Sequence, residues 1–251
     1  MNSVAEICCG SLEDSLNAQK AGADRIELNN AMYLYGLTPS LGTIELVVEY
    51  CHIPIVAMAR PRPGGFHYNE YEFDTIRKDV ESMLAYDIEG VAFGCLDEAG
   101  NIDVKKNQEI IDIIHKHNKD AIFHRAFDAV KDPYQSIELL IDLGVKRVLT
   151  SGLQPSAVDG VPLLAELQGK YGDRIEILAG GGIDAANCAH IKNKTGIQQY
   201  HSSCKTWRKD PTTIGNVSFA FAEPPHQEDY NIVGYNKAIS FVNAVKRNTV
   251  K

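Results

Sequence analysis

The chain has 251 residues, of which 44% are hydrophobic, and its formal net charge is −8 at pH 7. This acidic balance argues against nucleic acid or an anionic membrane as a partner, because those partners attract a basic face. No apolar run reaches the roughly 18 residues of a membrane span, and the first residues lack the regions of a secretory leader. The six cysteines include no Cys-x-x-Cys pair, so a cytoplasmic protein without a disulfide framework is expected.

Short strand-like segments alternate with amphipathic helical segments along the chain. Apolar residues follow helical spacing at Leu12–Ala21 and Ser136–Leu143. Several helices are predicted to end at a glycine in the left-handed conformation, as at Gly22, Gly144 and Gly196, just before the next strand. Strands are predicted at Val4–Cys9, Arg25–Asn29, Ile55–Arg60, Gly90–Gly94, Ala121–Arg125, Arg147–Ser151, Arg174–Ala179 and Ile197–Ser202.

These repeated units predict an α/β protein with a closed (β/α)8 TIM barrel. A doubly wound sheet is the alternative, and the missing G-x-G-x-x-G motif after the first strand counts against it. We expect a single domain over residues 1–251, with the eight βα units in residues 1–205. Residues 206–251 would then form a long loop and an extra, closing helix.

The tail after the eighth strand has two parts. Thr206–Tyr230 is polar and contains prolines, which predicts a loop. A loop of this length is uncommon without a purpose such as a lid or a subunit contact. Helical spacing returns at Asn231–Lys246, which is predicted to pack on the barrel.

Alternation along the strands predicts a polar barrel interior. The apolar face of each strand should pack on the surrounding helices, so the polar face points inward. This places Glu6, Glu27, His124 and His201 inside the barrel and turns Arg125 towards the rim or a neighbouring strand. Gathering so many ionisable groups in a core is unfavourable, which favours a functional site. The alternative is a buried network in which these groups satisfy one another.

The fifth strand ends in Phe123–Asp128, a segment that carries a histidine, an arginine and an aspartate. Ligands of parallel barrels bind at the C-terminal ends of the strands, so these side chains are predicted to face the ligand. Histidine is suited to proton transfer because its ordinary pKa lies near neutrality. The catalytic candidates are Glu27, His124, Glu6 and Asp128.

Two further strand ends favour binding of an anion. Arg60 and Arg62 alternate with prolines that stiffen the segment, and guanidinium groups suit carboxylate or phosphate; the alternative is pairing with surface acids. The glycine run after the seventh strand leads towards a helix, where backbone N–H groups can approach an anion. Hydroxyl groups at the sixth and eighth strand ends add donors or cap the next helix. The predicted ligand-binding residues are Arg60, Arg62, Arg125, Ser151, Gly180, Gly181, Gly182, His201, Ser202 and Ser203.

The cysteines are candidates for copper ligands, because thiolates are soft ligands that suit Cu(I). Cys8 and Cys9 are adjacent in a strand and face opposite ways, so they cannot easily hold one ion together. Only Cys8, Cys95 and Cys204 are placed to approach the mouth of the barrel. Cys8 is the predicted metal ligand, and most of the others are expected to be buried as small hydrophobic residues.

The ordered motifs along the eight strands resemble those of the CutC family of copper homeostasis proteins. The motifs are Glu6-Ile7-Cys8-Cys9, Gly22-Ala23-Asp24-Arg25-Ile26-Glu27-Leu28, Gly36-Leu37-Thr38-Pro39-Ser40-Leu41-Gly42, Arg60-Pro61-Arg62, Phe123-His124-Arg125-Ala126-Phe127-Asp128, Arg147-Val148-Leu149-Thr150-Ser151-Gly152 and His201-Ser202-Ser203. The resemblance implies a (β/α)8 barrel, a cytoplasmic location, a homo-oligomer of two or more subunits and a role in copper handling. It implies no particular reaction.

Three positions depart from the family pattern. Members often carry a cysteine at the end of the second strand, a candidate Cu(I) partner for the cysteine of the first strand, and here Asn29 stands there. Leu34-Tyr35-Gly36 replaces a usual Glu-Gly-Gly, and Pro63-Gly64-Gly65 replaces a usual Gly-Gly-Asp. The missing thiol weakens the expected copper site, whereas the Glu, Arg and His residues are retained.

Two functions follow from these residues, and whether the chain is an enzyme stays open. The first is a copper homeostasis protein that binds Cu(I) weakly through Cys8, with help from His201 or another residue at the mouth of the barrel. The alternative is an enzyme acting on a small anionic or phosphorylated metabolite. In that case Arg60, Arg62 and the Gly180–Gly182 loop would hold the anion, while Glu27 and His124 exchange protons. A third reading is an oligomeric scaffold with a vestigial pocket.

Overall fold

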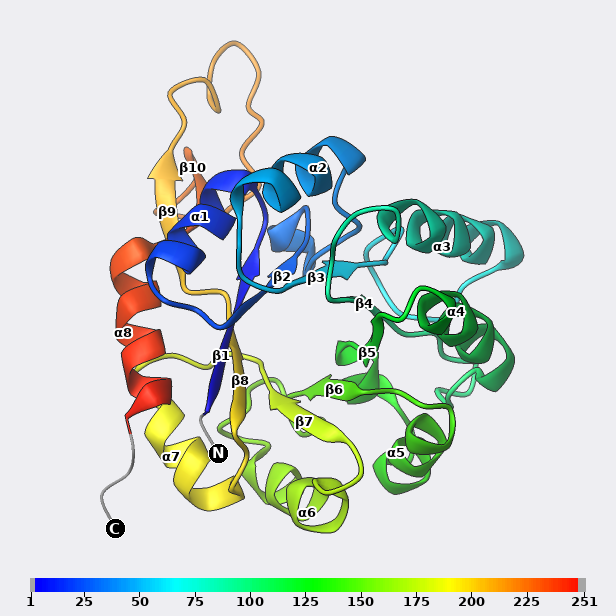
Figure 1. The fold of residues 1–251 in the computed structure, drawn as a ribbon. Helices are drawn as coiled ribbons and strands as arrows, with labels where there is room; N and C mark the ends of the chain where they lie inside the picture. Colours follow the sequence, from blue (N-terminus) through cyan, green and yellow to red (C-terminus); the bar gives the residue numbers. More distant parts are fainter. Residues whose placement is uncertain (1–2, 248–251) are drawn as a thin grey trace.

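In the computed structural model, which describes residues 3–247, eight parallel strands close into a barrel surrounded by helices (Figure 1). The last strand pairs with the first, with His201 opposite Glu6. The predicted (β/α)8 barrel is confirmed, and the doubly wound sheet is wrong because its outer strands would remain unpaired edges. The strands are β1 (Val4–Cys9), β2 (Arg25–Leu28), β3 (Ile55–Met58), β4 (Gly90–Phe93), β5 (Asp120–Phe123), β6 (Arg147–Thr150), β7 (Glu176–Ala179) and β8 (Gln199–Ser202).

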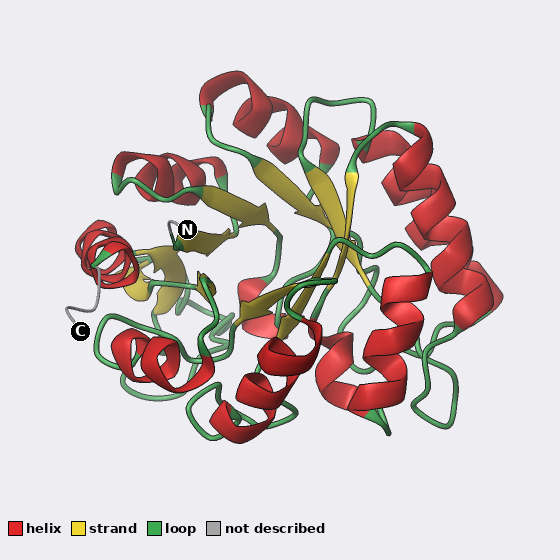
Figure 2. Cartoon of the chain, turned by 60° about the horizontal axis from the view of Figure 1, so that its bottom comes forward, coloured by secondary structure: helices red, strands yellow, loops and turns green. Residues whose placement is uncertain are grey.

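Helices form the outer layer of the molecule, as Figure 2 shows. Sequence signals start several of them: the side chains of Ser11, Ser40 and Asn69 each accept a hydrogen bond from a first-turn N–H group. The predicted glycine at the end of a helix is also confirmed, since Gly22 and Gly196 have φ of +84° and +73°. The helices are α1 (Leu12–Lys20), α2 (Leu41–Tyr50), α3 (Glu70–Met83), α4 (Val104–Lys116), α5 (Pro133–Asp142), α6 (Val161–Tyr171), α7 (Cys188–Thr195) and α8 (Tyr235–Lys246), with short 3-10 turns η1 (Met32–Leu34) and η2 (Arg125–Ala129).

The core has two parts, which the pleat of the strands keeps separate. Most buried apolar side chains lie in one large cluster between the strands and the helices. A small second cluster, Val56, Met58, Ala92 and Ile122, fills part of the barrel interior. Much of the remaining interior is polar, and the expected inward positions of Glu6, Glu27, His124 and His201 are confirmed. All four side chains are buried.

The tail differs from the prediction of a loop followed by an extra helix. Residues 205–209 and 229–233 form an antiparallel hairpin of β9 (Lys205–Lys209) and β10 (Asp229–Val233), which projects beyond the barrel (Figure 1). The hairpin was predicted as a loop because its sequence is polar. A two-stranded ribbon on the surface has no buried face, so its apolar and polar residues need not alternate.

Helix α8 starts at Tyr235 rather than Asn231 because the preceding residues pair within the hairpin. It contacts α1, α7 and β1, and therefore completes the ring of eight helices rather than adding an extra one. The hairpin is thus an insertion between the last strand and its helix.

No helix within residues 3–247 is long and apolar enough to cross a membrane. The predicted domain, residues 1–251, extends at both ends beyond the described residues.

Candidate functional site

A cavity of about 710 Å³ opens at the C-terminal ends of the strands. Ten of the residues singled out from the sequence line it. They are Cys8, Glu27, Arg60, His124, Arg125, Gly181, Gly182, His201, Ser202 and Ser203. The hairpin adds a wall that includes Trp207 and Phe221. The strand ends therefore converge on one cavity, as they do in other parallel barrels.

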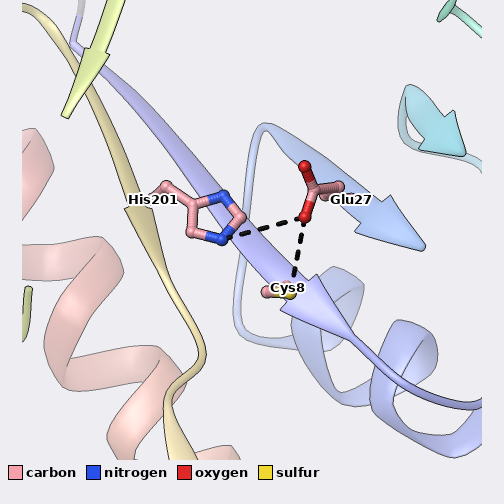
Figure 3. Close-up of side chains that lie close together, drawn as sticks. All are labelled: Cys8, Glu27 and His201. Carbon is pink, nitrogen blue, oxygen red and sulfur yellow. Dashed lines mark hydrogen bonds and ion pairs between the residues drawn. The ribbon is translucent and has the colours of Figure 1, made fainter. Parts of the chain in front are cut away.

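Three potential metal ligands from adjacent strands meet in this cavity (Figure 3). Cys8, Glu27 and His201 lie on β1, β2 and β8, and one ligand atom from each lies within 4.8 Å of the other two. Oε2 of Glu27 is 3.5 Å from Sγ of Cys8 and 4.0 Å from Nε2 of His201. Closure of the barrel creates this cluster, because it brings β8 beside β1.

Two residues after β2 complete the surroundings of Cys8. Sδ of Met32 lies 3.7 Å from Sγ of Cys8. Nδ2 of Asn29 donates to that sulfur at 3.2 Å and to Oε2 of Glu27 at 2.9 Å. Asn29 stands where the family resemblance expects a cysteine, so a thiol at this position would face Cys8. The amide instead orients the Glu27 carboxylate.

His201 is held by buried groups beneath the cavity. Nδ1 bonds Oε1 of Glu6 at 2.7 Å, and Nε of Arg25 donates to the other oxygen of that carboxylate at 2.5 Å. Burial alone would raise the pKa of Glu6, but the charge of Arg25 and the bond from His201 hold it well below its usual range. Glu6 does not line the cavity. It fixes the proton on Nδ1 and so leaves Nε2 to face Glu27 and the cavity.

The pKa values of the three cavity residues reflect their burial and mutual charge. Burial raises the pKa of Cys8, and the neighbouring Glu27 raises it further. Burial also raises the pKa of Glu27, against the opposing effect of His201. For His201, burial lowers the pKa, but the hydrogen bond that His201 donates to Glu6 and the charge of Glu27 outweigh it and raise the pKa overall. A bound cation would favour the deprotonated forms of all three groups.

His124 directly follows β5, across the barrel from β1. Its Nδ1 accepts a hydrogen bond from the N–H of Ala126 at 3.1 Å, and its buried Nε2 has no partner within the described chain. Burial and the charge of Arg60 lower the pKa of His124 to about 3. The ring is therefore neutral near pH 7 and offers a hydrogen-bond donor at Nε2 rather than a positive charge.

Asp128 and Ser151 lie outside the cavity lining and order the loop after β6. Asp128 accepts hydrogen bonds from the hydroxyl of Thr150, from Ser151 and from the N–H of Leu153. Nε of Arg125 also donates to Asp128, at 2.7 Å. These bonds occupy both oxygens of the carboxylate, so it positions Arg125 and the loop.

The two arginines after β3 bind the protein itself. Arg60 donates to the carbonyl oxygens of Leu34, Gly36 and Gly64, and this holds the loops after β2 and β3 together. Arg62 forms an ion pair with Glu72 and does not line the cavity. The alternative weighed from the sequence, pairing with a surface acid, therefore describes Arg62.

The glycine loop after β7 differs in one respect from the sequence expectation. Gly180 is buried against Leu149, whereas Gly181 and Gly182 line the cavity with φ of +105° and +72°. Helix α7 begins only at Cys188, so the loop does not run directly into a helix N-terminus. The hydroxyl of Ser202 donates to the carbonyl of Ile183 at 2.6 Å and thereby anchors the loop.

Met32 and the hairpin residues were missed as parts of the site. Met32 lies in the single turn η1, which is too short for any periodic pattern, and Trp207 and Phe221 lie in a segment predicted to be a loop. Of the other cysteines expected near the mouth, Cys95 and Cys204 are buried outside the cavity lining. The sequence signal that could have identified Met32 is its thioether, which lies shortly after β2.

Comparison with known proteins supports the copper-related resemblance. A sequence profile of the CutC family matches residues 3–206. A CutC family protein of Treponema denticola is 40% identical over 242 residues, which cover 96% of this chain and 98% of the relative. The human copper homeostasis protein cutC homolog is 35% identical over 244 residues, which cover 97% and 89%.

Among solved structures, a CutC protein from Streptococcus agalactiae superimposes with a TM-score of 0.76 and 29% identity, covering 80% of this chain and 98% of that chain. A phosphoribosyl anthranilate isomerase from Thermococcus kodakaraensis shares only the fold, with a TM-score of 0.57 and 14% identity over 98% of this chain and 100% of that chain. The family profile spans every strand of the barrel and the Cys8, Glu27 and His201 cluster. The chain therefore belongs to the CutC family.

Proposed function

We propose that the chain binds one Cu(I) ion at the mouth of its barrel, as the cargo of a copper homeostasis protein. The ligands would be the thiolate of Cys8, the thioether of Met32 and Nε2 of His201. The observation that carries the proposal is the approach of two sulfur atoms in the cavity, Sγ of Cys8 and Sδ of Met32, at 3.7 Å. The names of the human and streptococcal relatives agree with such a role.

The donor chemistry of the site fits Cu(I). Thiolate and thioether are soft ligands that select this ion, and imidazole also suits copper. Glu6 supports the imidazole through Nδ1, the arrangement in which a carboxylate orients a metal-binding histidine. Glu27 offers a hard oxygen ligand, and its contribution would be the negative charge that it places beside the ion.

Weak binding is expected for two reasons. Burial and Glu27 raise the pKa of Cys8, so the thiol keeps its proton near pH 7 and Cu(I) must displace it. Nδ2 of Asn29 carries hydrogens and has no free lone pair for a metal, although it lies 3.2 Å from the sulfur. A site with one thiolate holds Cu(I) less tightly than a site with two.

We place the protein in the cytoplasm and in a homo-oligomer. All six cysteines are free, which suits a reducing compartment. The cavity lining includes large apolar side chains that are exposed, such as Tyr35 at 86% and Phe221 at 43%, and such residues favour subunit contacts. Light scattering after size-exclusion chromatography measures the mass, and a monomer at micromolar concentration would contradict the oligomer.

Anaerobic titration with Cu(I) in competition with a chromogenic chelator of moderate affinity tests the copper proposal. Wild type should withdraw one Cu(I) per chain from the chelator. Cys8→Ala should withdraw none, whereas Cys204→Ala should behave as wild type because Cys204 does not line the cavity. The proposal fails if the chelator keeps its copper against wild type, or if Cys8→Ala competes equally well.

Asn29→Cys provides a gain-of-function arm of the same titration. The new thiol would face Cys8, and we expect Cu(I) affinity to rise by roughly tenfold or more because Cu(I) prefers thiolates. Asn30→Cys is the matched control, since the neighbouring side chain is exposed. Equal affinities for the two variants would contradict the assigned position of the ion.

A further inference from the structure

A second part of the cavity wall carries hydrogen-bond donors that the copper proposal does not use. The N–H groups of Gly181, Gly182 and Ile183 donate no hydrogen bond within residues 3–247. Gly181 and Gly182 hold left-handed φ values, and an added Cβ at Gly181 would lie 2.9 Å from Cβ of Ser151 and 3.5 Å from the guanidinium carbon of Arg125. Three consecutive N–H groups are therefore available beside a permanent cation.

That cation is held in place by the protein. Nε of Arg125 donates to Asp128 and Nη2 donates to the hydroxyl of Ser151, each at 2.7 Å. Nη1 has no acceptor within the described chain, and Arg125 lines the cavity. Two hydrogen bonds thus fix the guanidinium group, while Nη1 stays available to a ligand. This arrangement suits recognition of an oxyanion. Lys205 adds a second positive charge to the same lining.

His124 adds a third observation, a buried donor without an acceptor. Because Nδ1 accepts the N–H of Ala126, the proton of the neutral ring is on Nε2. This Nε2 has no partner within the described chain, and His124 is only 3% exposed and lines the cavity. Burying an unsatisfied donor is unfavourable, so an oxygen atom of a bound molecule would complete the wall.

We propose that the cavity binds a small organic phosphate in addition to any metal. The N–H groups of Gly181, Gly182 and Ile183, together with Nη1 of Arg125, hold the phosphate group, and Nε2–H of His124 meets an oxygen of the organic part. The number of donors favours a phosphate over a carboxylate, which has fewer oxygens to accept them. The cavity volume of about 710 Å³ is also larger than one ion requires.

The site goes beyond the proposed copper function and uses different residues, although both sites share one cavity. Cys8, Met32 and His201 come from β1, the turn after β2 and β8, whereas the phosphate donors follow β5 and β7. Loss of the thiol therefore should not remove the phosphate site. No reaction is assigned to the bound molecule.

Thermal unfolding and calorimetry with inorganic phosphate test the proposal, at constant ionic strength set with chloride. Wild type should show a melting temperature that rises with phosphate concentration, because a ligand that binds only the folded state stabilises it by mass action. Glycerol phosphate should bind more tightly than inorganic phosphate, since its hydroxyl groups can reach His124, and glycerol should have no effect. The same rise with chloride alone, or no rise with either phosphate, overturns the proposal.

Two pairs of variants locate the site. Arg125→Gln should raise the dissociation constant for phosphate by roughly tenfold or more, since charge-assisted hydrogen bonds are among the strongest. Arg208→Gln is its control, because Arg208 pairs with Glu13 away from the cavity lining. If Arg125→Gln fails to fold, the same test is applied at exposed residues of β9. Lys205→Gln is then the variant and Lys209→Gln is its control. Equal affinities within the pair that folds overturn the proposal.

Cys8→Ala separates this site from the copper site. The variant should lose Cu(I) binding and keep the phosphate-dependent rise in melting temperature. Loss of Cu(I) binding with the phosphate response intact supports both proposals. A phosphate response that disappears with the thiol overturns the separate phosphate site and leaves the copper proposal standing.

Discussion

The proton position and the charge of His201 depend on Glu6 and Arg25, two side chains that do not line the cavity. Glu6 lies between His201 and Arg25 and is 2% exposed, so its charge is screened little by water. Removing one member of a buried ion pair leaves the other charge uncompensated. The buried network that was weighed from the sequence as an alternative to function therefore exists for Glu6, His201 and Glu27, and it lies beneath the cavity. It does not include His124, whose Nε2 has no partner within the described chain.

Replacement of Glu6 by Gln tests this support. We expect the free energy of unfolding to fall by about 3 kcal/mol, because Arg25 then keeps only its weaker contacts with Glu89 and Gln199. Urea denaturation measures the loss. Glu13→Gln is the control, since this carboxylate forms an exposed ion pair with Arg208 and should leave stability near that of wild type. Equal stability of the two variants would contradict the role of Glu6.

His124 predicts a pH dependence of stability with a defined sign. In the unfolded chain it binds a proton below about pH 6.5, whereas in the folded chain its pKa is about 3. Between these values the unfolded state holds more protons, so the free energy of unfolding decreases as pH falls, by at most about 1.4 kcal/mol per pH unit. Metal-free His201 has the opposite sign: its raised pKa stabilises the folded state at low pH, and this contribution is lost as pH rises through that value.

The measurement is denaturation of wild type and His124→Gln at a series of pH values from 3 to 7. The difference in unfolding free energy between the two proteins should shrink or reverse towards low pH, since only wild type must take up a proton at this position on unfolding. His190→Gln, an exposed residue of α7, should run parallel to wild type. Parallel curves for His124→Gln would show that the ring is not held neutral.

At the scale of elements, the β9–β10 hairpin is the part of the chain that changes the barrel most. It separates β8 from α8, and its tip contributes Phe221 and Glu223 to the cavity wall. The N–H of Val233 donates to Asp14 at 2.7 Å, which fastens the end of β10 to α1. Phe221 also lies against Tyr33, with ring centroids 4.5 Å apart. These contacts make the hairpin a cover over the side of the cavity that holds Cys8.

Shortening the hairpin should expose Cys8 without unfolding the barrel. The N–H of Asp210 donates to the carbonyl of Glu228, so residues 211–227 can be replaced by an Asn-Gly turn beyond this pair. The far-ultraviolet circular dichroism should be preserved, and Cys8, the most exposed cysteine at 8%, should react faster with a thiol reagent. Adding Cys8→Ala should abolish the fast reaction. An unchanged rate of thiol modification would show that the tip does not cover the site.

At the scale of the whole molecule, the barrel can be predicted from sequence patterns that each span only a few residues. Apolar spacing, capping residues and the glycines after helices each act over a few residues, so the strands, the helices α1, α5 and α8, and the polar interior could be predicted from sequence. The hairpin could not, because an exposed two-stranded ribbon has neither a buried stripe nor an alternating face.

The composition of the site was decided only when the barrel closed. Pairing of β8 with β1 joins residues almost 200 positions apart in the chain, and it alone brings His201 to Glu6, Glu27 and Cys8. Residues of the same type then have different roles because their surroundings differ. Arg60 donates to three backbone carbonyl groups and Arg62 pairs with Glu72, whereas Nη1 of Arg125 faces no acceptor within the described chain. Local periodicity specifies which face a side chain takes, but partners depend on contacts between distant segments, and those exist only in the folded chain.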